Sequence, residues 1–205
     1  MKNVLNISKK GILMVTMFAT LLSFANEVSL FKIENDAERT SLTLTNVKQG
    51  NLLSIKNSNG VVLYKELIQQ SGIYSKGFDL TVLPNGGYIF ELDKDVEIQT
   101  IPFTVVSNTV TFKKELETTI FKPVTRVKGN MLFVSRLSLN KAPMEIAIYF
   151  TDYDNISSNQ ELIFSEKIKD TQSVNRIYKL TGINKGDYKV VFTTEERVFT
   201  TEINN

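Results

Sequence analysis

The stretch LPNGGY, residues 83–88, returns as INKGDY at residues 183–188, with a glycine and a tyrosine at the same places. Where a chain crosses from one sheet of a β-sandwich to the other, an apolar residue closes the core, a glycine permits the turn and a tyrosine braces it. The sequence therefore predicts two such corners, formed by Leu83, Gly86 and Tyr88 and by Ile183, Gly186 and Tyr188.

Apolar positions around the two corners also correspond at a constant offset. Phe78 and Phe90 of the first copy match Tyr178 and Val190 of the second. The offset breaks before residue 60, where NSNG is replaced by a longer polar loop at 152–160. Because the entropy of loop closure grows only slowly with length, such an insertion is tolerated. The chain therefore contains an internal repeat with one lengthened hairpin.

Short runs in which apolar and polar residues alternate fill both copies, and such runs predict strands. The predicted strands are 28–33, 41–47, 51–57, 61–68, 75–81, 87–93, 96–105, 118–122, 131–139, 144–150, 161–168, 174–181, 186–194 and 197–204. This spacing predicts an all-β fold of two tandem immunoglobulin-like antiparallel sandwiches, 26–113 and 114–205. Asn59-Gly60 predicts a type I′ hairpin turn. Pro102 predicts an edge position or a bulge, because proline cannot donate to a ladder.

The first 25 residues have the composition of a secretory signal peptide. Lys2, Lys9 and Lys10 precede an uncharged apolar run from Gly11 to Ala25. That run is shorter than the ~20 residues that span a bilayer, so we expect removal before Asn26 and no transmembrane segment in the mature chain. The expected location is the periplasm, the cell surface or the medium.

The charge balance excludes one class of partner. Removing the three lysines from the 24 basic residues leaves 21 against 22 acidic ones, a net charge near −1. A nearly neutral chain lacks the basic footprint of a nucleic-acid-binding protein.

The chain has no cysteine, so neither disulfides nor a lipidated cysteine can hold it. Each sandwich must therefore be stabilised by its own core.

The residue types that are missing exclude most catalytic chemistry. The chain contains no histidine and no cysteine, which removes Ser-His-Asp and Cys-His catalysis and the usual zinc ligands. We also expect no cofactor, since no glycine-rich loop precedes a helix. Glu91 and Asp93 share one strand face and are the remaining candidates for a two-carboxylate glycoside hydrolase. We expect them instead to be solvated charges near a turn.

The lengthened loop supplies the one candidate metal site. Asp152, Asp154 and Asn155 are oxygen ligands of the kind that calcium prefers. The spacing departs from a calcium loop at Ser157, where glycine is expected, and at Ile163, where an acid is expected. A polar loop without a metal fits the pattern better.

The segments NLLSIKNSNGVVLYKELIQQSG at 51–72 and FDLTVLPNGGYIFELDKDVEIQTIPF at 78–103 carry a family resemblance. They resemble the C-terminal sorting domains of type IX secretion cargo in Bacteroidetes, and small secreted β-sandwich domains from the same bacteria. TGINKGDYKVVF at 181–192 resembles them more loosely. The resemblance implies an exported protein of the cell envelope.

Together these features predict a non-enzymatic binding or structural protein. Its partner is expected to be a protein or a glycan at the cell envelope. The alternatives are a type IX sorting or anchoring module, which rests on the resemblance, and a small carboxylate-dependent glycoside hydrolase, which rests only on Glu91 and Asp93.

Overall fold

The computed structural model describes residues 31–36, 39–152, 160–181 and 185–204. The predicted signal peptide lies outside these residues. The strands and the 3₁₀ turn of the described residues are β1 Phe31–Asp36, β2 Arg39–Val47, β3 Leu52–Asn57, β4 Val62–Leu67, β5 Gly72–Phe78, β6 Gly86–Asp93, β7 Glu97–Val106, β8 Thr109–Phe112, η1 Lys114–Leu116, β9 Thr118–Phe121, β10 Val124–Lys128, β11 Met131–Leu137, β12 Met144–Asp152, β13 Glu161–Ile168, β14 Ser173–Lys179, β15 Gly186–Thr194 and β16 Arg197–Ile203.

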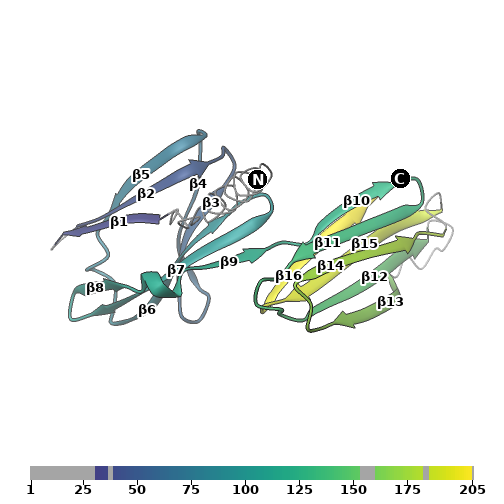
Figure 1. Ribbon diagram of the computed structural model, residues 1–205. Helices are drawn as coiled ribbons and strands as arrows, with labels where there is room; N and C mark the ends of the chain where they lie inside the picture. The colour runs from purple at the N-terminus through teal and green to yellow at the C-terminus, as the bar shows by residue number, and fades with distance from the viewer. Residues whose placement is uncertain (1–30, 37–38, 153–159, 182–184, 205) are drawn as a thin grey trace, which may run out of the picture.

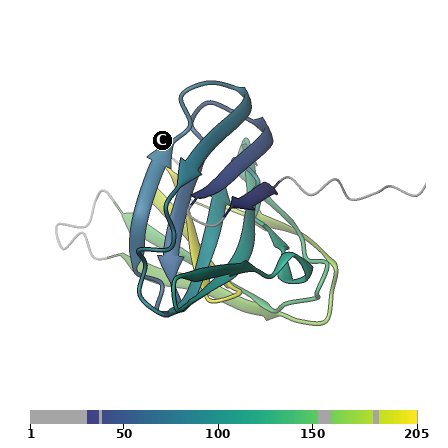
Figure 2. The ribbon, with the colours of Figure 1, turned by 90° about the vertical axis from the view of Figure 1, so that its left-hand side faces the viewer.

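These strands form the same pair of sheets twice. In the first half, the sheet β1-β2-β5 faces the sheet β4-β3-β6-β7-β8, and in the second half β10-β11-β14 faces β13-β12-β15-β16. All of the strand pairs are antiparallel. The two halves follow one another end to end (Figures 1 and 2). The predicted fold class, two immunoglobulin-like sandwiches, is confirmed.

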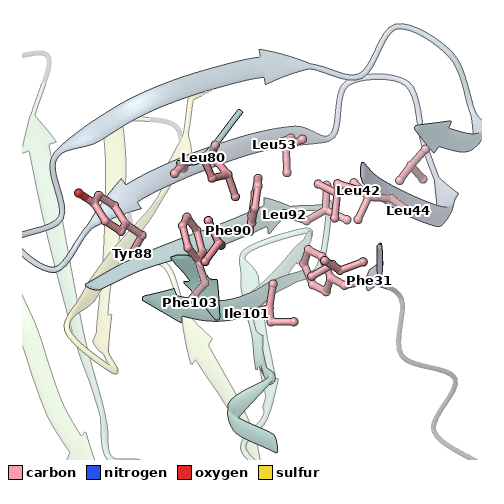
Figure 3. Close-up of a cluster of buried hydrophobic side chains, with 14 of the residues drawn as sticks. Phe31, Leu42, Leu44, Leu53, Leu80, Tyr88, Phe90, Leu92, Ile101 and Phe103 are labelled. Carbon is pink, nitrogen blue, oxygen red and sulfur yellow. The ribbon is translucent and has the colours of Figure 1, made fainter. Parts of the chain in front are cut away.

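Each half has its own apolar core. The first contains Tyr88, Phe90 and Phe103 among its buried residues, and the second contains Tyr188 and Phe192. In Figure 3 the labelled side chains of the first core lie together, and Tyr88 sits at one end with its hydroxyl directed away from them. Burying each large apolar side chain stabilises the folded state by about 1.5–3 kcal/mol, so these cores replace the missing disulfides.

One predicted strand belongs to a different sheet from the one expected. The range 118–122 was predicted to begin the second sandwich, but β9 pairs with β7 of the first half, with Ile98 opposite Ile120. The first strand of the second half is β10, which the alternation did not predict. Four of the five residues of β10 are exposed, so the strand carries no regular apolar pattern.

The hairpin turns differ from the expected types. Of Asn59 and Gly60 only Gly60 has a positive φ, and its N–H donates to Asn57 O at 3.0 Å. A register shift follows in β3–β4, so this is a type I turn with a glycine bulge and not type I′. Both central residues have positive φ at Ser107-Asn108 instead, between β7 and β8. Pro102 lies between the parts of β7 that pair with β9 and with β8.

Candidate functional site

Each of the two corner tyrosines is buried and donates its hydroxyl to backbone. Tyr88 is 6% exposed and donates to Pro84 O at 2.6 Å, while Tyr188 is 2% exposed and donates to Thr181 O at 2.6 Å. Burial also raises the pKa of Tyr188. A buried phenol whose hydroxyl is satisfied by backbone stabilises the fold and leaves no group free for a ligand.

The remaining corner residues differ between the copies. Leu83 packs against the first core, whereas Ile183 lies outside the described residues. A Cβ at Gly86 would meet nothing closer than 3.8 Å, but one at Gly186 would overlap Thr151 O and approach Phe150 Cζ to 2.7 Å. Only Gly186 is therefore required by close packing, and neither glycine has a positive φ.

The candidate calcium loop is described only at its first residue. Asp152 ends β12, where it lies opposite Gly186, and Asp154 and Asn155 fall outside the described residues. Within the described ranges, no group of three or more acidic side chains could hold a metal ion.

In the same residues, no helix is long and apolar enough to cross a membrane.

A polar cluster joins the two sheets in each half. Its carboxylate and its cation, Glu66 and Lys76 in the first half, correspond to Glu166 and Arg176 in the second at an offset of 100 residues. In the first half Lys76 Nζ donates to Glu66 Oε2 at 2.5 Å, and the hydroxyls of Tyr64 and Tyr74 donate to the same oxygen. In the second half the equivalent Glu166 accepts from Arg176 and from Tyr178. The sequence analysis did not identify this cluster, although its charged residues repeat at the same constant offset as the corner residues. In each sandwich the cluster therefore links an edge strand of one sheet to an edge strand of the other.

The cluster predicts a specific dependence of stability on pH. The hydrogen bonds from Lys76 and then Tyr64 lower the pKa of Glu66 from 4.5 to about 2. A lowered folded-state pKa stabilises the protein above pH 4.5, and this stabilisation disappears as pH falls toward 2. We expect Glu66→Gln to cost about 1 kcal/mol at pH 6 and less at pH 2.5, measured by urea unfolding. A cost that does not change with pH would contradict this assignment.

A second polar site lies where the two halves meet. Glu91 lies on the outer face of the first sheet, yet it is only 5% exposed, because Lys56 and, from the second half, Arg197 bind it there. Its Oε1 accepts from Lys56 at 2.7 Å and its Oε2 from Arg197 at 2.5 Å. Burial alone would raise the pKa of Glu91, but the bonds from Arg197 and Lys56 outweigh burial and lower it. The expectation that Glu91 is a solvated turn residue was therefore wrong.

Two further side chains fix this junction. Lys122, directly after β9, donates to Lys94 O at 2.5 Å and pairs with Asp93. Arg136 of β11 donates to Phe121 O at 3.1 Å and to Glu195 at 2.8 Å, and its side chain is fully buried. The first contact holds the end of β9 to the β6–β7 turn, and the second holds it to the β15–β16 turn. Together they position Arg197, the first residue of β16, beside Glu91.

These contacts leave a groove of about 530 Å³ between the outer face of the first sheet and the start of β16. Its walls are partly apolar, from Leu52, Val62, Ile98, Val198 and Phe199. Its charged residues are four cations and two anions, namely Lys56, Lys65, Lys122, Arg197, Glu91 and Asp93. This volume is in the range of small-ligand sites, and the excess of cations favours an anionic ligand.

The electrostatics of the groove do not suit carboxylate hydrolysis. A glycosidase needs one carboxylic acid with a raised pKa to protonate the leaving group. Glu91 has a lowered pKa and is bound to two cations, and Asp93 is paired with Lys122. Both carboxylates therefore serve as counter-ions that fix the positions of basic side chains.

The similarity of this chain to known proteins is confined to structural matches of low identity and low TM-score. No family model and no curated protein matches the sequence. The structure is similar to a biofilm-associated protein BSP domain, with 12% identity and a TM-score of 0.28 over 85% of this chain and 29% of that one. It is also similar to a two fibronectin type-III domain segment of chicken tenascin, with 11% identity and a TM-score of 0.27 over 85% and 97%. The human OSCAR ligand-binding domain matches with 8% identity and a TM-score of 0.25 over 84% and 93%.

Proposed function

We propose that this chain is an exported, non-enzymatic protein that binds a partner at the bacterial cell envelope. The observation that carries the proposal is the groove at the junction, because Arg197 of the second half binds Glu91 of the first there, beside three lysines of the first half. Concave sites at the meeting of two folded units are common ligand-binding positions. The apolar N-terminal run and the resemblance to exported sandwich domains support the location.

The proposed units run from 26 to 122 and from 123 to 205. This boundary replaces the expected one after residue 113, because β9, at Thr118–Phe121, pairs with β7 of the first half. Pro123 follows directly on Lys122, and β10 begins at Val124. The groove therefore includes residues from both sides of the boundary, and neither unit forms it alone.

The proposed location is tested by fractionating cells that express the whole chain. We expect the protein in the periplasm, on the surface or in the medium, shortened by the 25 residues of the signal peptide, as mass spectrometry would show. A control that lacks residues 2–25 should stay in the cytoplasm. Recovery of the uncleaved chain in the cytoplasm would contradict the proposal. Turnover of a glycan by the purified protein, lost on Glu91→Gln, would contradict its non-enzymatic character.

The second candidate function is a type IX sorting or anchoring module. The observation that favours it is the repeated corner around Tyr188, within the segment that resembles the sorting domains. Deleting residues 123–205 should then stop the remaining chain in the periplasm of a type IX host. Unchanged delivery to the cell surface after this deletion would remove the candidate and leave the binding role.

A further inference from the structure

The outer edge of β4 is open to a further strand. β4 is the first strand of its sheet, and among the described residues no strand pairs with its free edge. Val61, Val62, Leu63 and Leu67 along this edge are 46–55% exposed. An edge that presents unpaired backbone groups and apolar side chains is a template for pairing with another chain. Such an edge suits strand addition by an extended peptide.

The groove next to this edge supplies positive charge on one face. Lys65 of β4 lies opposite Ser54, and Ser54 lies opposite Glu91, so the three share the outer face of the sheet. The Glu91 carboxylate is already shared by Lys56 and Arg197, and Asp93 is paired with Lys122. Lys65 makes no hydrogen bond or ion pair with any other described side chain. An acidic side chain of a bound peptide would find its counter-ion here.

On the other face of β4, a carboxylate and a cation are already paired with each other. Glu66 lies opposite Leu53 on the core side, where it is bound by Lys76, Tyr64 and Tyr74. A second acidic residue beside Glu66 would lack a counter-ion, since Lys76 is already paired with Glu66. Side chains of a strand alternate between its faces. A matching peptide therefore has acidic residues at every second position and apolar residues between them.

We propose that the free edge of β4, together with the groove beside it, binds an extended segment of a partner protein in which acidic and apolar residues alternate. This inference rests on the proposed binding function and names the class of partner. A peptide fits better than an anionic glycan for two reasons. It can pair its backbone with β4, and the exposed apolar residues of this edge are aliphatic, whereas the aromatic ring of the groove, Phe199, is partly buried against the second core.

The test measures binding of fluorescent peptides to the purified protein by anisotropy at low and at high salt. We expect a capped ten-residue peptide of alternating Glu and Val to bind about 10-fold more tightly than five Glu followed by five Val, which has the same composition. Methylating alternate backbone nitrogens should abolish binding, because it removes the pairing amides. High salt should weaken it.

Matched variants locate the site. Lys65→Glu should weaken the binding of the alternating peptide about 10-fold, because it replaces electrostatic attraction by repulsion at the groove. Lys167→Glu is the control, since Lys167 lies on β13, the equivalent edge strand of the second half, and it should change the affinity less than about 2-fold. The inference would be overturned if the two substitutions had equal effects, or if the block peptide bound more tightly than the alternating one. It would also be overturned if the protein bound heparin but not the peptide, or bound neither. Export of the chain would stand in each case, so the two proposals fail separately.

Discussion

Replacing Gly186 by alanine is expected to lower the free energy of unfolding by about 3 kcal/mol, the upper part of the range for forced overpacking. The new Cβ would overlap the carbonyl oxygen of Thr151 and lie 2.7 and 2.8 Å from Phe150 Cζ and Cε2. The Thr151 oxygen belongs to the backbone of β12, which pairs with β15 at this point, so it cannot move without disturbing the ladder. Phe150 in turn packs on the Tyr188 ring, with centroids 4.8 Å apart.

Gly86→Ala is the matched control for this substitution. Gly86 begins β6 as Gly186 begins β15, and a Cβ there would meet only the Tyr88 ring, at 3.8 Å. We expect a change within about 0.5 kcal/mol, as for ordinary surface positions. Urea unfolding of both variants measures the difference. Equal losses would show that the crowding at Gly186 is relieved by movement of the backbone.

Tyr88→Ala is expected to destabilise the first sandwich by about 3–5 kcal/mol. The Tyr88 ring stacks on Phe103, with centroids 5.3 Å apart, and Phe103 in turn lies against Phe90, with centroids 5.4 Å apart. Truncation would open a cavity beside these rings and remove the bond to Pro84 O. Because domains are stable by only about 5–15 kcal/mol, this loss is a large part of the total.

Tyr88→Phe measures the contribution of the hydroxyl to stability apart from that of the ring. The ring packing stays, and the carbonyl of Pro84, an exposed residue, is accessible to water once the hydroxyl is gone. We therefore expect a loss of about 1 kcal/mol, at the low end for an unmade hydrogen bond. A loss as large as that of Tyr88→Ala would show that the hydroxyl, and not the ring, holds the corner.

The strands were predictable because their period of two reflects which face is buried, and this holds even without knowledge of the partner strand. Tyr88, Phe90 and Leu92 point inward for that reason, and they are buried. The pairing of β9 was not predictable, since four residues with little alternation fit either half. Sequence also gave no signal for the contact between Glu91 and Arg197, because their 106-residue separation exceeds any local pattern.

The turn types were also not predictable from the residues of the turns alone. Asn59-Gly60 has the composition of a type I′ turn, but the side chain of Asn57 accepts from the N–H groups of Asn59 and Val61 and stabilises the longer loop. Glu195 and Glu196 both adopt positive φ at the β15–β16 turn, against their intrinsic preference. Arg136 binds Glu195 there, so tertiary contacts outweigh local propensity.

Calorimetry of the Tyr88→Ala protein tests most directly the central claim that two separately cored sandwiches, joined by a polar junction, make up this chain. We expect the transition of the first half to move down by more than about 10 °C while that of the second stays within about 2 °C. The second half keeps its own core around Tyr188 and loses only contacts such as that between Arg197 and Glu91 when the first half unfolds. A single transition that shifts as a whole would contradict the claim, because the two corners would then belong to one cooperative unit.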